Sequence, residues 1–163
     1  MIVNITPQIS FGSVYDLDPF YLQNQNITHI IQLSDGFPNL GNRFPLQRYI
    51  FQFREENIGV QEIKYILQKL AFLLHDYTLN PYHNILVICN SGTYKSALMC
   101  LAYMVIIKKL DLNKCVSYIK NKNPDCLKDL SRLSFRVLMG YDLNNKNPPI
   151  NEVDIYNRIY RID

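Results

Sequence analysis

One segment in the second half of the chain constrains the fold more than any other feature. Residues 85–97 read ILVICNSGTYKSA. The segment opens with four apolar residues, three of them β-branched, which is typical of a short strand buried on both faces of a parallel sheet. Small polar residues follow and lead into an apolar stretch at helical spacing from Ser96 onward. The segment therefore predicts a strand–loop–helix unit of an α/β protein, with the strand over 85–88 and the helix over 96–109.

The loop of this unit has the composition of an anion-binding cradle around Cys89. The carboxyl end of a strand in an α/β sheet is where such folds place their ligands. Backbone N–H groups of the loop and the positive end of the following helix can hold a phosphate there. The residues expected to form this cradle are Asn90, Ser91, Gly92, Thr93, Tyr94 and Lys95.

The same field favours a reactive thiol. A positive environment lowers the pKa of a cysteine, so Cys89 is the candidate nucleophile, and Ser96 is placed to donate its hydroxyl to the thiolate. Gly92 permits the tight turn and Lys95 supplies a cation, while Tyr94 either lines the mouth of the pocket or shields it. The alternative is that Cys89 is a small apolar residue ending a core strand, since free cysteines are commonly buried and inert.

The bulk properties fit one compact domain. The chain has 163 residues, 48% hydrophobic and 19% charged, which is ordinary for a globular protein. Its apolar stretches are too short to span a bilayer, and its N-terminus lacks the pattern of a signal peptide. The four cysteines show no paired metal spacing, so we expect reduced thiols, no metal and no cofactor. A net charge of +3 suits an anionic ligand but does not indicate nucleic acid.

Hydrophobic periodicity and turn residues predict alternating strands and helices around this unit. The three histidines, His29, His75 and His83, are expected to be structural or exposed. The expected strands cover residues 5–14 (or a hairpin broken at Gly12), 27–34 and 49–54, with a loop over 35–45. The expected helices cover residues 19–25, 61–77, 113–122 and 127–139, the last with Gly140 as its C-cap. We expect the domain to cover 1–140, and residues 141–163 to pack back on it or to act as an interaction arm.

The order of these motifs resembles the dual-specificity phosphatases, a branch of the protein tyrosine phosphatase superfamily. The resemblance covers about residues 5–139. It is carried by ISFGSVYD (residues 9–16), NITHIIQLS (26–34), YIFQFREEN (49–57), LVICNSGTYKSALMCLAYMV (86–105) and the segment 112–124. It implies a single-domain α/β fold with a central mixed or parallel sheet flanked by helices. It also implies that Cys89 is the nucleophile, Ser96 the hydroxyl serving the thiolate, and 90–95 the phosphate cradle.

Three positions depart from the family pattern. The family has His before the cysteine and Arg after five residues, whereas this chain has Ile88 and Lys95. Lys is a flexible point charge and cannot reproduce the planar fork of Arg. The family's general acid is an Asp, and Glu56 falls at that position with Glu55 beside it. The alternative for both glutamates is a pair of solvated loop carboxylates.

These departures leave three interpretations. The first is a pseudophosphatase that binds a phosphorylated protein, or another phosphate-bearing ligand, with little or no catalysis. The second is a weak dual-specificity phosphatase that works through a phosphocysteine on Cys89, with Lys95 and Glu56 as imperfect substitutes. The third is a scaffold with a vestigial pocket that binds a protein partner through its helices or tail. All three place the protein in the cytoplasm, with the nucleus as an alternative, and away from membranes.

Overall fold

The computed structural model describes residues 1–33, 46–52, 55 and 58–146. Its centre is a five-stranded sheet in the order β1-β2-β5-β3-β4. The strands are β1 (Val3–Asn4), β2 (Ile9–Ser13), β3 (His29–Gln32), β4 (Gln47–Ile50) and β5 (Ile85–Cys89). Only the β1–β2 pair is antiparallel, and the other three pairs are parallel. The expected mixed, largely parallel sheet is therefore confirmed.

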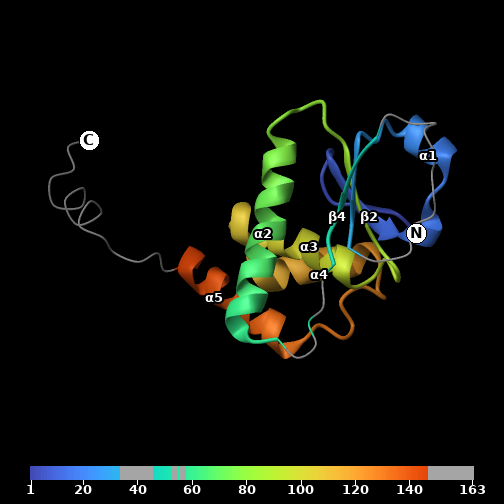
Figure 1. Ribbon diagram of the computed structural model, residues 1–163. Coiled ribbons are helices and arrows are strands. Elements are labelled where there is room, and N and C mark those ends of the chain that lie inside the picture. Colours follow the sequence, from blue (N-terminus) through green and yellow to red (C-terminus); the bar gives the residue numbers. More distant parts are fainter. Residues whose placement is uncertain (34–45, 53–54, 56–57, 147–163) are drawn as a thin grey trace, which may run out of the picture.

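Helices cover both faces of this sheet (Figure 1). They are α1 (Pro19–Asn24), α2 (Val60–Thr78), α3 (Lys95–Ala102), α4 (Leu112–Lys122) and α5 (Arg132–Lys146), with a 3-10 turn η1 (Val14–Asp16) and a π-helical segment η3 (Tyr103–Ile107). Residues of α2, α3, α4 and α5 share one large hydrophobic cluster, whereas Leu22 of α1 lies in a smaller cluster with Ile88. Within the described residues, no helix is long and apolar enough to cross a bilayer.

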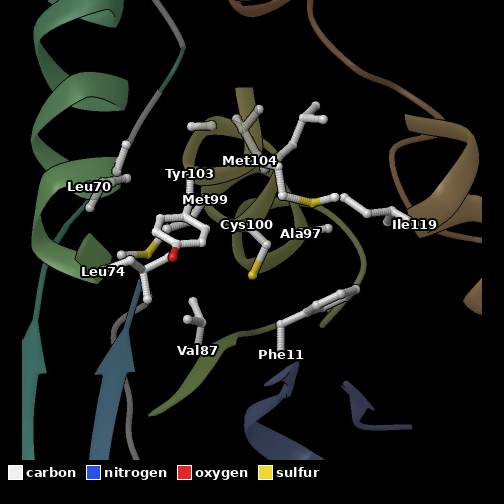
Figure 2. Close-up of a cluster of buried hydrophobic side chains, with 14 of the residues drawn as sticks. Phe11, Leu70, Leu74, Val87, Ala97, Met99, Cys100, Tyr103, Met104 and Ile119 are labelled. Atoms are coloured by element: carbon white, nitrogen blue, oxygen red, sulfur yellow. The ribbon is translucent and has the colours of Figure 1, made fainter. Parts of the chain in front are cut away.

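The large cluster places α3 at the centre of the domain. Val87 and Phe11 rise from β5 and β2 toward Ala97 and Met99 of α3, and Leu70 of α2 closes the side (Figure 2). All five side chains are almost fully buried. Burying one such apolar side chain contributes roughly 1.5–3 kcal/mol. The loop before α3 is thus held between a buried strand and a buried helix.

The strands and the helix in the middle of the chain largely follow the predicted hydrophobic periodicity. β3 lies within its expected strand, β5 extends one residue beyond its own to Cys89, and the inward positions of α2 include Ile63, Leu67 and Leu74. β4 begins two residues earlier than expected and ends at Ile50. The expected loop over 35–45 lies outside the described residues.

The helix expected over 127–139 is wrong at both ends. Leu127 has a φ of +59°, so the chain turns there, and α5 starts only at Arg132. At the other end α5 continues through Gly140 to Lys146. A tertiary contact favours this extension, because the buried carboxylate of Asp142 accepts the backbone N–H of Leu112 at 3.0 Å. The first six residues of the expected extension at 141–163 thus belong to α5.

A histidine cluster lies at the amino ends of the parallel strands. His29 is 5% exposed, its ring centroid is 4.2 Å from that of His83 and 4.7 Å from that of Tyr77. Its Nδ1 lies 2.7 Å from Oγ1 of Thr28. Burial lowers the pKa of His29, and the neighbouring His83 lowers it further, against a hydrogen bond with Gln47 that raises it.

This arrangement predicts acid-sensitive stability. With its pKa lowered by folding, His29 stays neutral in the native state but binds a proton in the unfolded chain once the pH falls below about 6.5. The contribution of His29 to stability is therefore fully present above that pH and is lost as the pH falls below it. We expect the urea midpoint to drop between about pH 7.5 and about pH 5.5, and the drop to shrink in His29→Gln. His75→Gln is the control, and an equal loss of acid sensitivity in both variants would contradict this assignment.

Candidate functional site

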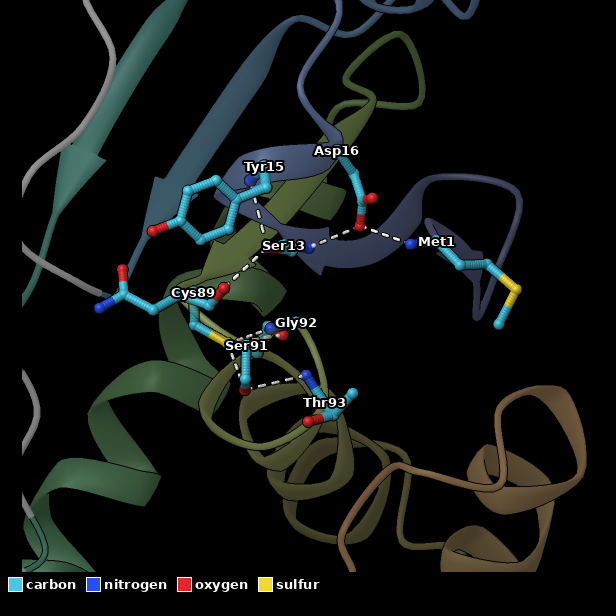
Figure 3. Close-up of polar contacts among 10 residues, drawn as sticks. Met1, Ser13, Tyr15, Asp16, Cys89, Ser91, Gly92 and Thr93 are labelled. Atoms are coloured by element: carbon cyan, nitrogen blue, oxygen red, sulfur yellow. Dashed lines mark hydrogen bonds and ion pairs between the residues drawn. The ribbon is translucent and has the colours of Figure 1, made fainter.

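The loop from Asn90 to Tyr94 is closed against strand β2. β2 and β5 run parallel, and Ser13 is the register partner of Cys89. The Ser13 hydroxyl donates to the backbone carbonyl of Asn90 at 2.7 Å, which ties the start of the loop to the neighbouring strand (Figure 3). The backbone N–H of Ser13 in turn donates to Asp16, whose carboxylate pairs with the N-terminal amine at 2.6 Å.

Gly92 is required by the backbone of this closed loop. Its φ is +72°, in the left-handed region that disfavours side chains. A Cβ on Gly92 would lie 2.5 Å from the backbone nitrogen of Ser13 and 2.8 Å from the carbonyl carbon of Gly12. The loop therefore packs backbone against backbone, which only glycine allows at this position.

The thiol of Cys89 lies at the bottom of the loop and is surrounded by hydrogen-bonding groups. The Gly92 N–H donates to Sγ at 3.2 Å, the Ser96 Oγ lies 3.2 Å from it, and the Ser91 Oγ lies 3.8 Å from it. Cys89 is only 2% exposed. Burial raises the pKa of this thiol, but the hydrogen bonds from Ser96, Gly92 and Ser91 outweigh it and hold the pKa below its ordinary value. The site thus stabilises the thiolate relative to that of an ordinary cysteine.

The other three cysteines behave in the opposite way. Burial raises the pKa of Cys100 far above the ordinary range, and it raises the pKa of Cys115 and of Cys126 to about 11. All four cysteines are free thiols. Cys89 is the single cysteine whose surroundings stabilise the charged form, so the interpretation of Cys89 as an inert core residue does not fit its hydrogen bonds.

The contact with Ser96 leads to a measurable prediction. Ser96 is fully buried, so Ser96→Ala removes the hydroxyl with little change of volume, and the pKa of Cys89 should rise. We expect the pH midpoint of Cys89 alkylation by iodoacetamide to move upward, with the alkylated residue identified by peptide mass. Ser117→Ala, an exposed serine on α4, serves as the control. An unchanged midpoint in Ser96→Ala would contradict this role of the hydroxyl.

Glu55 and Tyr94 meet beside the loop. The hydroxyls of Ser131 and Ser134 both donate to the Glu55 carboxylate, and the backbone N–H of Ser131 donates to the Tyr94 oxygen at 3.1 Å. Burial, followed by a hydrogen bond to Glu55, raises the pKa of Tyr94 to about 12, so its phenol stays neutral. Glu55 is half-buried and fixed, which excludes the alternative of a solvated loop carboxylate for this residue.

An open cavity of about 430 Å³ lies over this network. Ser91, Thr93 and Tyr94 contribute to its wall, so Tyr94 lines the mouth. The remaining lining residues come from 55 and from the segment before α5, and they are Glu55, Asp125, Lys128, Asp129 and Ser131. Across the described ranges, no group of three His, Cys, Asp or Glu side chains is arranged to hold a metal ion.

The expected site residues are thus partly brought together. Asn90 and Ser91 are exposed, Gly92 is buried, and Thr93 and Tyr94 are half-buried around the cavity. Lys95 is the first residue of α3, one position earlier than the expected helix start, and it is half-buried. Glu56 lies outside the described residues, so its role as general acid stays a prediction.

Ile88 points away from the thiol. Successive residues of a strand face opposite sides of the sheet, and Ile88 packs with Leu22 and Ile30 in the smaller cluster while Cys89 belongs to the larger one. Ile88 therefore packs against Leu22 of α1, as expected for an apolar side chain. It brings no polar group to the loop.

The sequence did not point to Ser13, Ser131 or Ser134. Ser13 contacts the loop only because β2 is the neighbour of β5, and the two other serines reach Glu55 across more than seventy residues. No local pattern distinguishes these serines from surface serines. Ser13 lies in the expected opening strand, but the sequence did not indicate that this strand is the neighbour of the Cys89 strand.

Comparisons with known proteins agree with this geometry. The family model described as "Dual specificity phosphatase, catalytic domain" matches residues 9–136. Human dual specificity protein phosphatase 2 is 28% identical over 121 residues, which cover 74% of this chain and 37% of that protein. The chain thus spans well under half the length of this relative.

Solved structures show the same fold. The crystal structure of DUSP15 superposes with a TM-score of 0.69 at 17% identity, over 99% of this chain and 97% of that one. A mouse putative dual specificity phosphatase complexed with zinc tungstate superposes with a TM-score of 0.63 at 18% identity, over 88% and 87%. Fold, family model and the arrangement around Cys89 lead to the same conclusion: the chain belongs to the dual specificity phosphatase family.

Proposed function

We propose that the protein binds the phosphate group of a phosphorylated protein, or of another phosphate-bearing ligand, in the Cys89 loop, and that it turns this ligand over slowly or not at all. The observation that carries the proposal is the backbone of the loop. Gly92 presents its N–H inward to Cys89 and closes the loop against β2. A cradle made by the backbone does not depend on the residues that differ from the family pattern.

The impairment follows from the residues at the ends of the loop. Lys95 stands where the family has Arg, and a lysine supports one charged contact in place of a bidentate pair. Ile88 contributes packing and no hydrogen bond to the loop. Glu56 stands where the family has Asp and is one methylene longer, and the carboxylate of its neighbour Glu55 is bound by Ser131 and Ser134. Phosphate binding is supported by the backbone of the loop, whereas catalysis would rely on the residues that differ from the family pattern.

A second candidate, a weak phosphatase, is favoured by the stabilised thiol. In that reaction the Cys89 thiolate attacks phosphorus, the ester P–O bond breaks, and Glu56 gives its proton to the leaving oxygen. Water then attacks the phosphocysteine, releasing inorganic phosphate and returning the thiolate to its contact with Ser96. The lowered pKa of Cys89 supports the first step of this cycle.

Oxyanion binding and turnover, measured side by side on the full chain, test the proposal. We expect tungstate at about a hundred times its dissociation constant to raise the melting temperature on the order of 5–10 °C. We expect the release of aryl alcohol from an aryl phosphate to stay near the level of Cys89→Ser. No shift with tungstate, vanadate or phosphate would refute the binding pocket. Cys89-dependent turnover at ordinary enzyme rates would refute impaired catalysis, and the protein would then be a working phosphatase.

A further inference from the structure

A second cavity, of about 400 Å³, lies apart from the Cys89 loop and shares no lining residue with the cavity there. We call it the η3–α4 groove. The connection between β1 and β2, the π-helical segment η3 and the start of α4 form its walls. Its lining residues are Ile5, Thr6, Tyr103, Met104, Lys108, Leu110, Asp111, Lys114, Cys115 and Tyr118.

The groove is apolar with a basic rim. Six of its ten lining side chains are hydrophobic or aromatic, and Lys108 and Lys114 stand beside them. Leu110 is 46% exposed and Tyr118 is 40% exposed, so part of this apolar surface meets solvent in the described part of the chain. A surface of this kind favours an amphipathic segment that also carries carboxylates.

Helix α5 brings the chain to the edge of this groove. The Lys146 ammonium lies 2.7 Å from the carboxylate of Asp111, which lines the groove. One residue earlier, the Asn145 amide donates to the backbone carbonyl of Val105 in η3 at 3.0 Å. Two side chains of the last turn of α5 therefore fix its end beside the groove. Any residue after Lys146 starts from this rim.

The sequence that follows has matching composition. Residues 147–163 read NPPINEVDIYNRIYRID, and Pro148-Pro149 prevents α5 from simply continuing. Ile150, Val153, Tyr156 and Tyr160 recur at helical spacing. The carboxylates of Glu152 and Asp154 lie in the first half of this segment, and Arg158 and Arg161 lie in the second. At the helical rise, eleven residues span about 16 Å, so residues 150–160 are long enough to lie along a groove that begins near the segment's own anchor point.

We propose that residues 150–160 occupy the η3–α4 groove of the same chain, with the apolar side chains against Met104, Leu110 and Tyr118 and the carboxylates toward Lys108 and Lys114. The tether favours this occupant over a free partner, because a segment fixed at the rim is present at a high effective concentration. The inference does not depend on phosphate binding or turnover at Cys89.

Disulfide trapping in the full chain tests this placement. Leu110→Cys is combined with Tyr156→Cys, and Leu79→Cys with Tyr156→Cys is the matched control, since Leu79 is 69% exposed and does not line the groove. Because the tether concentrates the segment at the groove, we expect the intramolecular disulfide of the first pair to form on the order of tenfold faster than that of the control. Peptide masses identify the bond and distinguish it from bonds to the native cysteines.

Hydrogen exchange supplies an independent readout. In the full chain carrying Tyr156→Asp and Tyr160→Asp, we expect amides of residues 103–118 to exchange faster than in the unaltered chain, while those of β5 keep their rates. Equal trapping at positions 110 and 79 would overturn the proposal, as would unchanged exchange over 103–118. Trapping found only between two chains would also overturn it, since the occupant would then be the segment of a second copy.

Discussion

Lys95→Arg is expected to raise the turnover of an aryl phosphate on the order of a hundred- to a thousandfold, because a charged donor aimed at the transition state contributes that much to rate. Lys95 is the first residue of α3 and is half-buried at the end of the loop that Gly92 closes. A guanidinium there can hold two phosphate oxygens in one plane, which an ammonium cannot do. The arginine guanidinium would then add the bidentate phosphate contact that the backbone cradle and the Cys89 thiolate lack.

The control for this gain is a Lys→Arg change at a lysine that lines the cavity beside the loop. Lys128 lines the cavity and pairs with Asp125 at 2.7 Å, yet it stands outside the loop, so Lys128→Arg should leave turnover unchanged. Adding Cys89→Ser to Lys95→Arg should abolish the gain, since the reaction begins at that thiol. An unchanged rate in Lys95→Arg, with tungstate binding retained, would show that the arginine is not the missing element.

Gly92→Ala is expected to remove oxyanion binding and to lower the free energy of unfolding by about 2–5 kcal/mol, the sum of a left-handed side chain and an overpacked contact. The added Cβ would meet the backbone of Ser13 at 2.5 Å, and a strand in the middle of the sheet cannot shift as a side chain can. The tungstate-induced rise in melting temperature should disappear, and the urea midpoint should fall.

Gly140→Ala provides the matched control. Gly140 lies inside α5, and a Cβ there meets nothing within 4 Å. Alanine in a helix interior is favoured over glycine by roughly 0.5–1 kcal/mol, so this variant should be as stable as the unaltered protein or slightly more stable, with tungstate binding unchanged. Equal losses of stability in the two variants would contradict the requirement for glycine at position 92.

Local sequence was sufficient wherever one element decides its own structure. The apolar run of β5 and the periodic face of α2 each gave the expected element to within one residue at each end. At the site, the sequence predicted that Gly92 and Ser96 act together with Cys89, and the structure has the Gly92 N–H and the Ser96 hydroxyl in contact with the Cys89 sulfur. The roles of these residues in binding or catalysis stay predictions. These residues are neighbours in sequence, so a pattern in the chain directly reflects their arrangement in space.

Contacts between segments that are distant in the chain could not be predicted from the sequence. The end of α5 illustrates this, because glycine at position 140 indicated a helix end, yet contacts of Asp142 and Asn145 with the segments at 105 and 112 extend the helix. Glu55 is the same case at the site, since the two serines that fix its carboxylate lie on α5 or just before it.

The sequence by itself therefore determined the strand–loop–helix unit, the place of Cys89 in it and the family to which they point. The tertiary structure decided which groups complete it: Ser13 from the adjacent strand, and the network of Glu55 and Tyr94. The physical reason is that the loop's own geometry follows from short-range backbone preferences. Its partners, in contrast, depend on strand order and helix packing, which the whole hydrophobic core selects at once.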